Sequence, residues 1–580
     1  MKSLFIGWDA NGRPVRVPAE TRLQTHTHVI GGSGTGKSKF LEHMIRQEIH
    51  ESQGLCVIDW HGTLYENLVE WCAFHDVGVF GDSRRLILLD PAHPDFVTGF
   101  NPFMKLGADV GTQVNRRIVA TIKPWGQSDT NEMPTFERVC RLVYTFAVER
   151  KETLPNAAHL LDLERRDLRD VAYETAGDSR IRSGWRWLQN ITDVREWNNT
   201  VLSTENRLTR FLTSRTIKRF MGLTERNLDL MEAMERGHIV LVNLADTDFL
   251  SREEARLFAA LLLNEFFETA MRRAGKLKPG EDPIPFVLYL DEFQEYINND
   301  LAAMLDEVRK GGLHMVLAHQ HLGHFIENRR LQKSVFTNAR IRAVFGGLDY
   351  EDAAIIANEM FLPDLNTRQI KKAYYHTIHL YREETRMIHG HTQGGGSAHM
   401  TGAGANTGES LPTAAVEGWF AQPQGTSFSG ESSSESDSEN SSATDTESEV
   451  PVFVPIPVKE LGSEAEWSRE EKVSRVVQTL KMQQQRHCFV KIDTEPTQPM
   501  KVPLVRRHAL ESDMMLEYRE GVYSEQGALP AAEVDRIIDA REAAFLTVAA
   551  PSDDENFAEK EIPIKPRNSK KKRTRLGAVK

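Results

Sequence analysis

The chain has 580 residues, of which 40% are hydrophobic and 27% charged, and its net charge is −12. This length exceeds what one compact core usually holds, so we expect two or more folded units joined by linkers. The negative net charge excludes a uniformly basic surface, and any contact with nucleic acid would need a local basic patch. The 4 cysteines are far apart in sequence, which argues against a zinc site or a disulfide framework and favours a reducing compartment.

The sequence contains no segment that predicts a membrane helix or a signal peptide. Residues 1–9 include too short an apolar stretch for a signal peptide. A membrane helix needs roughly 18 consecutive apolar residues. The most hydrophobic segment, 257–267, is interrupted by Asn264 and Glu265, so we expect a buried helix there. The sequence therefore predicts a cytoplasmic protein.

Short apolar runs rich in Val, Ile and Leu recur through the first part of the chain. Because these runs lack polar alternation, they are typical of strands buried on both faces, as in a parallel sheet between layers of helices. Helical patterns follow several of them, most clearly after the capping box that begins at Ser251 and ends at Glu254. Strand and helix in alternation predict a doubly wound α/β domain. The runs lie at 28–30, 55–58, 86–89, 239–242, 286–290, 315–317 and 341–345.

The pattern changes along the chain and predicts a division into segments. The strand-like runs stop after residue 104 and return near residue 237, and the residues between have helical periodicity. A later stretch is rich in Gly, Ser and acids and cannot bury enough apolar surface to offset its conformational entropy. The expected segments are a first part of the core at 1–104, an all-helical insertion at 105–236, a second part of the core at 237–392, a disordered Gly/Ser/acidic linker at 393–450, a C-terminal segment packing on the core at 451–552 and a basic disordered tail at 553–580.

A phosphate-loop motif lies near the start of the chain. It follows the apolar run that ends at Ile30 and precedes a helical pattern that begins at Phe40. Its glycines would let consecutive backbone N–H groups face a phosphate at a helix N-terminus. The alternative, a glycine-rich turn without a ligand, fits the flanking strand and helix less well, so the motif predicts a site for ATP and Mg²⁺. The residues are Gly31, Gly32, Ser33, Gly34, Thr35, Gly36, Lys37 and Ser38, with Lys37 expected on the β- and γ-phosphates and the Ser38 hydroxyl on Mg²⁺.

Two acids, Asp291 and Glu292, end the apolar run 286–290. A buried parallel strand would deliver both to the carboxyl edge of the sheet, where nucleotides bind in such folds. We expect Asp291 to hold Mg²⁺, directly or through water, and Glu292 to polarise the attacking water. The alternative is a pair of acids that merely starts a loop. Beside a phosphate loop, the pair favours ATP hydrolysis over nucleotide binding alone.

Two further polar residues flank the next apolar run. Gln320 stands directly after 314–319, where it could sense the γ-phosphate or orient water. Arg309 precedes that run and could reach the γ-phosphate of a neighbouring subunit as an arginine finger. The alternative for Arg309 is a solvated charge at the end of a helix.

Several motifs resemble those of HerA/FtsK-type ATPases, in particular the branch of type IV secretion coupling proteins and conjugative-transfer ATPases. The segment Asp59-Trp60-His61-Gly62-Thr63-Leu64 resembles the Asp-Pro-His-Gly-Asp-Leu element of this family. Residues 99–103 resemble its Asn-Pro segment, and Trp125-Gly126 with 136–138 is similar to the start of its helical insertion. The segments from 237 to 345 keep the family order. The resemblance covers about residues 5–390 and, more loosely, 451–510.

The resemblance implies a RecA-like P-loop fold and a ring, usually a hexamer, with ATP sites between subunits and a pore that pulls DNA. It favours Arg309 as the finger and Gln320 as the sensor, with Arg340 as the other candidate finger. Trp60 and Thr63 stand where the family usually has Pro and Asp, which leaves the roles of Asp59 and His61 open. Coupling proteins carry N-terminal membrane helices, for which the residues before the loop leave no room. We therefore expect no integral membrane segment and at most a peripheral place at a membrane through partners.

The leading hypothesis is an ATP-hydrolysing ring motor that translocates DNA in conjugation-like transfer, mobilisation or packaging. A nuclease, a relaxase or a secretion apparatus would be its possible partner. One alternative is a secretion-system ATPase that moves protein. Another is a nucleotide-controlled interaction module, in which the acidic tract 427–449 and the basic run 570–575 serve as docking segments. Otherwise the tract is a spacer and the run a solvated tail.

Histidines cluster in two places but predict no metal site. Because neither cluster has a convincing set of Cys or acidic ligands nearby in sequence, we expect surface or packed side chains. The residues are His319, His321, His324, His376, His379, His389 and His391.

Overall fold

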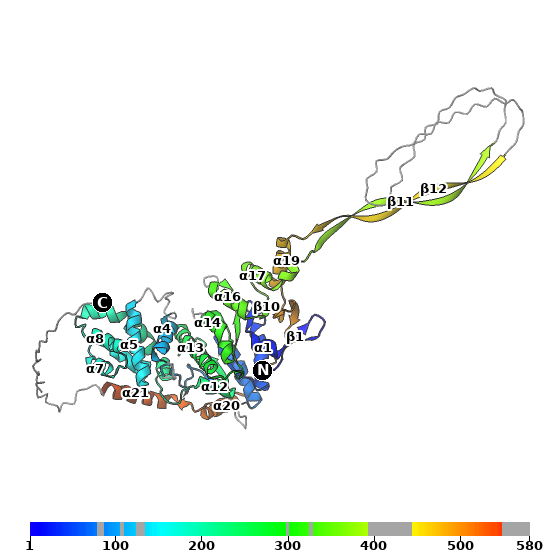
Figure 1. Ribbon diagram of the computed structural model, residues 1–580. Helices are drawn as coiled ribbons and strands as arrows, with labels where there is room; N and C mark the ends of the chain where they lie inside the picture. Colours follow the sequence, from blue (N-terminus) through cyan, green and yellow to red (C-terminus); the bar gives the residue numbers. More distant parts are fainter. Residues whose placement is uncertain are drawn as a thin grey trace, which may run out of the picture. The chain divides into compact units, whose positions relative to one another are not determined.

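The computed structural model describes residues 1–77, 86–104, 109–122, 134–296, 301–323, 329–392 and 444–547 (Figure 1). The chain divides into two compact units, one formed by Met1–Phe361 with Val476–Lys580 and the other by Leu362–Arg475. The predicted linker at 393–450, up to residue 443, and the predicted tail at 553–580 lie outside the described residues. So do Trp125, Gly126 and His324. No helix among the described residues is long and apolar enough to cross a membrane.

The first unit is built on an 11-stranded sheet with the order β2-β1-β14-β13-β10-β3-β9-β8-β4-β7-β5. All neighbours from β10 to β5 are parallel, whereas β13, β14, β1 and β2 are antiparallel to their neighbours. The predicted α/β fold with a mostly parallel sheet is confirmed. The strands are β1 (Leu4–Asp9), β2 (Pro14–Val17), β3 (Thr27–Ile30), β4 (Gly54–Asp59), β5 (Leu86–Leu89), β7 (Ile239–Asn243), β8 (Phe286–Leu290), β9 (Leu313–His319), β10 (Ile341–Phe345), β13 (His487–Ile492) and β14 (Gln498–Lys501).

Every residue of β4, β5, β8, β9 and β10 is buried. This is the burial expected of parallel strands covered by helices on both faces. The longest helix of the unit, α13 (Arg252–Lys276), begins with the predicted capping box, since Ser251 and Glu254 each bond the other's backbone. Other helices of the core are α1 (Ala19–Gln24), α2 (Lys37–His50), α3 (Thr63–Phe74), α14 (Leu301–Glu307), α16 (Arg329–Asn338) and α17 (Tyr350–Met360).

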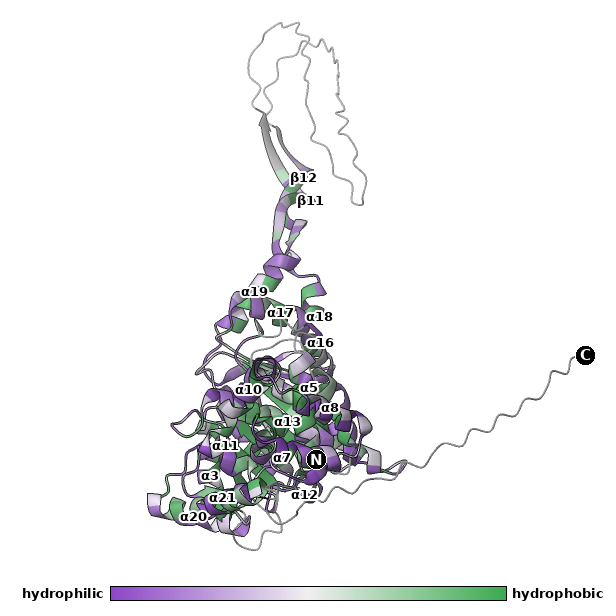
Figure 2. Cartoon of the chain, turned by 90° about the vertical axis from the view of Figure 1, so that its left-hand side faces the viewer, coloured by the Kyte–Doolittle hydropathy of each residue, from purple (hydrophilic) through white to green (hydrophobic). Residues whose placement is uncertain are grey.

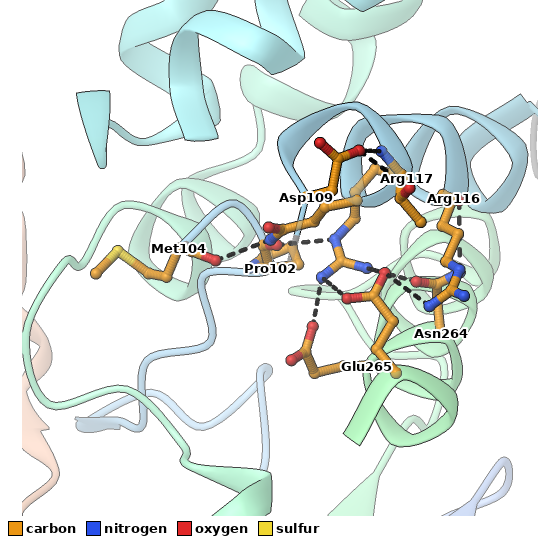
Figure 3. A network of polar contacts seen from close by, with 10 residues as sticks. Pro102, Met104, Asp109, Arg116, Arg117, Asn264 and Glu265 are labelled. Atoms are coloured by element: carbon orange, nitrogen blue, oxygen red, sulfur yellow. Dashed lines mark hydrogen bonds and ion pairs between the residues drawn. The ribbon is translucent and has the colours of Figure 1, made fainter. Parts of the chain in front are cut away.

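Between residues 109 and 236 the described chain is helical apart from turns and connections. One buried polar network joins this helical region to the core helix α13 (Figure 3). Arg117 on α4 is fully buried; its Nε donates to the carbonyl of Pro102 at 2.8 Å, and its Nη atoms reach Glu268 at 3.0 Å, Glu265 at 2.5 Å and Asn264. A buried cation is tolerated because it is paired and fully hydrogen-bonded. The helices are α4 (Val110–Ile122), α5 (Pro134–Arg150), α6 (Leu154–Ala158), α7 (Arg166–Thr175), α8 (Ser179–Gln189), α9 (Val194–Trp197), α10 (Ser203–Leu212), α11 (Arg215–Met221) and α12 (Leu230–Arg236).

The C-terminal segment contributes strands to the main sheet in addition to packing on it. β13 pairs with β10 in antiparallel fashion, and β14 links β13 to β1. Further along, the short β15 (Leu529–Pro530) pairs with β6 (Phe96–Val97). The helices α20 (Ser512–Glu525) and α21 (Ala531–Thr547) complete the described part of this segment.

The second unit consists mainly of a long two-stranded ribbon, formed by β11 (Ile370–Thr392) and β12 (Thr444–Glu466). It also contains α18 (Leu362–Asn366) and the start of α19 (Arg469–Lys481). This differs from the expected segments, which placed residues up to 392 in the core and the linker up to 450. The linker was predicted from a change in composition, which gave no sign of the two strands beside it. These strands pair with each other although more than 50 residues separate them in sequence.

Candidate nucleotide-binding site

The phosphate loop lies at the carboxyl end of β3 and leads into α2. Its first residues are held by the neighbouring strands, because the Gly31 N–H donates to the carbonyl of His319 at 3.3 Å and the Gly32 N–H to that of Gly346 at 2.9 Å. Within the loop, the Thr35 hydroxyl donates to the Gly32 carbonyl at 2.8 Å. The loop is therefore fixed at the edge of the sheet where the sequence predicts it.

Two glycines of the loop occupy positions where a residue with a side chain would clash or be strained. A Cβ atom on Gly32 would lie 2.7 Å from the carbonyl oxygen of Gly347, so the close approach of these two backbones requires glycine. Gly36, the N-cap of α2, has a φ of +111°, in the left-handed region that L side chains rarely adopt. The turn leaves the N-terminus of α2 open, which is the arrangement that binds phosphate. These features fit a nucleotide.

Two of the predicted catalytic residues, Glu292 and Gln320, meet Lys37 at one carboxylate. Lys37 on α2 donates to Oε1 of Glu292 at 3.1 Å, and the side-chain amide of Gln320 donates to the same oxygen at 2.6 Å. Gln294 donates to the other oxygen, Oε2, at 2.6 Å. The structure thus brings Lys37, Glu292 and Gln320 together from three separate stretches of the chain. It also adds Gln294, to which the sequence alone assigns no role.

The electrostatics differ between the two acids. Burial raises the pKa of Asp291 to about 7, against the attraction of Lys37, while Asp59 and Glu292 add to the rise. Burial also opposes ionisation of Glu292, but Lys37 and the amide of Gln320 hold the pKa of Glu292 below its ordinary value. Glu292 is therefore an anion held in place by donors. Its backbone φ of +50° is unusual for a residue with a side chain and is the kind of local strain found at functional sites.

Asp59 is buried and organises the start of α3. Its Oδ1 accepts the N–H of His61 at 3.0 Å, and its Oδ2 accepts the N–H of Tyr65 at 2.8 Å. Burial raises the pKa of Asp59, and the same bonds oppose this rise. His61 itself is exposed and lines an open groove of about 890 Å³ that also includes Arg507 and Arg519. In the structure, Asp59 is thus a backbone-holding residue next to the acid pair, and His61 faces the groove.

Arg309 and Arg340 lie at the opposite edge of the sheet from the phosphate loop. Arg309 lies in a short 3-10 helix directly before β9, and Arg340 stands directly before β10. Both β9 and β10 pair with β3 in parallel orientation, and the carboxyl end of β3 carries the loop. The starts of β9 and β10 therefore lie at the other edge of the sheet. Arg309 donates to the carbonyl of Gln24, and no carboxylate lies within 4 Å of it among the described residues. Arg340, in contrast, pairs with Asp493 at 2.7 Å.

The structure also supplies contacts that the sequence analysis missed. The N–H of Arg486, just before β13, donates to the carbonyl of Thr35 at 2.9 Å, so the C-terminal segment braces the phosphate loop. No sequence signal marks this contact, because the two residues are about 450 positions apart. Behind the loop, His28 and His319 join their Nε2 atoms at 2.6 Å, and burial lowers the pKa of both. Both histidines are buried, and His319 is one of those for which the sequence predicts a packed or surface position.

One histidine, however, does lie beside acids. His321 offers a ring nitrogen within 4.8 Å of carboxylate oxygens of Asp349 and Asp352. The acids have structural roles, since Asp352 accepts the N–H of Leu322 at 2.8 Å and Asp349 caps α17. The sequence predicts no convincing set of Cys or acidic ligands for these histidines, and the structure corrects this for His321 by placing two acids beside it. The cluster itself is accounted for by helix capping and packing.

The mostly parallel sheet, with the phosphate-loop motif after β3 and the acid pair after β8, has the arrangement of a RecA-like P-loop fold. Similar solved structures include a bacterial conjugative coupling protein, TrwBΔN70, with 13% identity, 87% of this chain and 89% of that chain covered and a TM-score of 0.47. The plasmid coupling protein TrwB in complex with a non-hydrolysable ATP analogue matches with 12% identity, 87% and 91% coverage and a TM-score of 0.48. VirB4 of Thermoanaerobacter pseudethanolicus matches with 12% identity, 64% and 93% coverage and a TM-score of 0.39.

TrwB is described as a conjugative coupling protein, and coupling proteins are the group whose motifs the sequence resembles. No family model matches the chain, and neither does any curated protein.

Proposed function

We propose that the chain is an ATP-hydrolysing ring motor that translocates DNA. The observation that carries the proposal is the meeting of Lys37, Glu292 and Gln320 at the mouth of the phosphate loop. A loop that only binds nucleotide has no use for a buried carboxylate held by three side-chain donors. Such a carboxylate is suited to accept a proton from an attacking water.

The residues present fit ATP and Mg²⁺. The loop amides, Lys37 and Ser38 would hold the phosphates and the ion, and Asp291 would contact the ion directly or through water. Bound Mg²⁺ would neutralise phosphate charge. When Lys37 turns to the phosphates, Oε1 of Glu292 loses its cationic partner and becomes available to water. Gln320 and Gln294 then keep the carboxylate oriented, so nucleotide binding and activation of the base are coupled through Lys37.

The position of Arg309 supports a site shared between subunits. Because Arg309 lies at the amino edge of the sheet and the phosphate loop at the carboxyl edge, it does not serve the nucleotide of its own chain. In a ring, the amino edge of one subunit can face the loop of the next. Arg309, which forms no ion pair within 4 Å among the described residues, is then the preferred finger, and Arg340, which is bound to Asp493, is not.

The DNA part of the proposal rests on the order of the motifs from Gly31 to Phe345, which resembles that of DNA-pumping ATPases. It is tested by measuring ATP hydrolysis with single-stranded DNA, with double-stranded DNA and without DNA. We expect DNA to stimulate hydrolysis, and we expect Lys37→Ala and Glu292→Gln to lower the rate by at least about 10²-fold. A high rate of ATP hydrolysis that neither single-stranded nor double-stranded DNA changes would refute translocation of DNA. It would favour a motor that moves protein. Slow hydrolysis, unchanged in Glu292→Gln, would favour a nucleotide-controlled interaction module.

The shared site is tested by mixing variants. Arg309→Ala and Lys37→Ala chains should each be inactive, but a mixture should regain activity, because some interfaces then combine an intact loop with an intact arginine. Removal of an arginine finger costs about 10³-fold or more. Arg340→Ala is the matched control and should retain hydrolysis within a few-fold. If the mixture does not regain activity, the shared site is refuted. The proposal that the chain hydrolyses ATP is not affected by that result.

A further inference from the structure

Two histidines meet in the interior of the first unit, behind the phosphate loop. Figure 2 shows green, hydrophobic stretches in the middle of this unit, around α13. His28 on β3 is 1% exposed, and His319, the last residue of β9, is 0% exposed. Buried polar atoms are costly unless they are hydrogen-bonded. The partners of the ring nitrogens therefore decide what this pair can hold in place.

The two rings meet edge to edge. Their Nε2 atoms are 2.6 Å apart, while their centroids are 4.9 Å apart and their planes are inclined by 16°. Atoms of rings stacked face to face stay about 3.5 Å apart or more. The shorter distance between the nitrogens of His28 and His319 is therefore that of a hydrogen bond, in which one ring donates and the other accepts.

A neighbouring carbonyl determines which nitrogen carries each hydrogen. Both rings are neutral near pH 7, because burial lowers the pKa of His28 to about 3 and that of His319 well below its ordinary value. Nδ1 of His319 lies 2.8 Å from the carbonyl oxygen of His321, which can only accept, so this Nδ1 carries the hydrogen. Nε2 of His319 is then an acceptor, and Nε2 of His28 is the donor. Nδ1 of His28, which has no hydrogen-bond partner among the described residues, is the nitrogen left without a hydrogen.

The resulting chain of hydrogen bonds runs from β3 to the turn after β9. His28 donates to His319, and His319 donates to the carbonyl of His321. The second of these bonds spans Gln320, whose amide donates to Oε1 of Glu292 at 2.6 Å. The side chain that contacts the expected catalytic base is thus carried on a three-residue turn that an imidazole closes.

His319 also contacts the other two motifs of the site. Phe293, the residue after Glu292, packs on the His319 ring with centroids 5.2 Å apart and planes at 89°. Such an edge-to-face arrangement is one of the favoured geometries of ring pairs. The backbone carbonyl of His319 accepts the N–H of Gly31, the first residue of the phosphate loop. One residue therefore touches the phosphate loop, the segment after the acid pair and the turn that carries Gln320.

We propose that His28 and His319 are positioning residues for Gln320. They hold its amide against Glu292, and this inference rests on the proposed hydrolysis of ATP and deepens it. Without the hydrogen that His28 donates, Nε2 of His319 is a buried acceptor without that partner, which is unfavourable. The ring then moves its hydrogen to Nε2 or turns, and Nδ1 no longer donates to the carbonyl of His321. The turn loses the bond that closes it.

The test compares two substitutions of His28 in the full chain. His28→Leu removes the donor, whereas His28→Gln keeps a side-chain N–H and is the matched control. We expect His28→Leu to lower kcat at least about tenfold and His28→Gln to keep kcat within about threefold. The Kd of a non-hydrolysable ATP analogue, measured by titration calorimetry, should stay within about twofold in both variants. A higher Kd with unchanged kcat would refute the positioning role and assign His28 to nucleotide binding.

A double-mutant cycle shows whether His28 acts through Gln320. Gln320→Ala removes the side chain that the pair is proposed to position, so adding His28→Leu should lower kcat no more than about twofold further. Losses that multiply would mean that His28 acts elsewhere and would refute the proposal. Unchanged kcat in His28→Leu, beside normal hydrolysis by the wild type, would refute it alone. A wild-type chain that hydrolyses no ATP would overturn the proposed function as well.

The hydrogen positions can be measured in the wild-type chain, without relying on a variant that hydrolyses ATP. Two-bond ¹H–¹⁵N NMR spectra of the chain labelled at histidine distinguish the two neutral tautomers, and the signals missing from His28→Gln assign that ring. We expect the hydrogen on Nε2 in His28 and on Nδ1 in His319. The opposite tautomers, or a charged ring at pH 7, would refute the chain of donors and with it the proposal.

Discussion

The buried acid Glu265 makes the stability of the first unit depend on pH in a direction that can be worked out. Glu265 lies on α13 with its carboxylate 2.5 Å from the guanidinium of Arg117. Burial raises the pKa of Glu265 from its ordinary 4.5 to about 7; Arg117 opposes this rise and Glu268 adds to it. Glu265→Gln keeps the shape of the side chain and an acceptor for Arg117, but it removes the titration.

The sign follows from the proton count. Between pH 4.5 and pH 7 the folded state binds more protons at Glu265 than the unfolded state does. The free energy of unfolding therefore falls as the pH rises through this window. A displacement of 2.5 pH units between these values corresponds to about 3 kcal/mol at about 1.4 kcal/mol per unit. The contribution is fully present below pH 4.5 and is lost above pH 7.

The assay is urea unfolding of the wild type and of Glu265→Gln at several pH values from about 4 to about 8, which bracket both pKa values. The difference in unfolding free energy between the two chains cancels all other titrating groups. We expect this difference to shift by about 3 kcal/mol in favour of the variant as the pH rises. A difference that does not change with pH would refute the elevated pKa. A shift in favour of the wild type would mean that Arg117 outweighs burial and that Glu265 is ionised throughout.

Three further outcomes are expected. Arg117→Met leaves buried acids without their cation and should lower the unfolding free energy by about 3–5 kcal/mol, measured by the same urea titration. Gly36→Ala forces a side chain to a φ of +111° against neighbouring backbone and should weaken ATP binding at least tenfold, whereas Gly34→Ala, at +75° with open space around it, should weaken it less; nucleotide titration calorimetry separates the two. Arg309→Ala should lose hydrolysis about 10³-fold while Arg340→Ala keeps it, and equal effects would contradict the different partners of these arginines.

Much of the core could be predicted from the sequence because its strands are buried on both faces. Such strands appear as unbroken Val, Ile and Leu runs, and each predicted run is a strand of the main sheet. Motifs formed by residues close together in sequence were equally informative, as the capping box at Ser251 and the phosphate loop show. The acid pair followed from the same logic, since the residue after a buried parallel strand must lie at the carboxyl edge of the sheet.

The remaining features depend on contacts between distant residues. The left-handed backbone of Glu292 and the bond from Arg486 to the phosphate loop have no local sequence signature. The pairing of β11 with β12 was not predicted, for another reason. Its strands alternate or mix apolar and polar residues and border a stretch of Gly, Ser and acids, so composition outweighed the period-two pattern at 450–458. Both faces are exposed within the chain, and burial alone therefore gave no reason to expect paired strands there.

The surroundings of Arg309 bear on the proposed ring, in which the nucleotide site of one chain is completed by its neighbour. Burial and the neighbouring Arg340 lower the pKa of Arg309 and outweigh Asp306, which raises it, so the guanidinium is held where a cation is disfavoured. Asp493 neutralises Arg340, but the hydrogen bond of Arg309 goes to a backbone carbonyl, that of Gln24. A cation in this position gains most from an anion that approaches the amino edge of the sheet. The γ-phosphate at the loop of a neighbouring copy has that charge, and we infer that its arrival offsets the cost of holding Arg309 beside a second arginine.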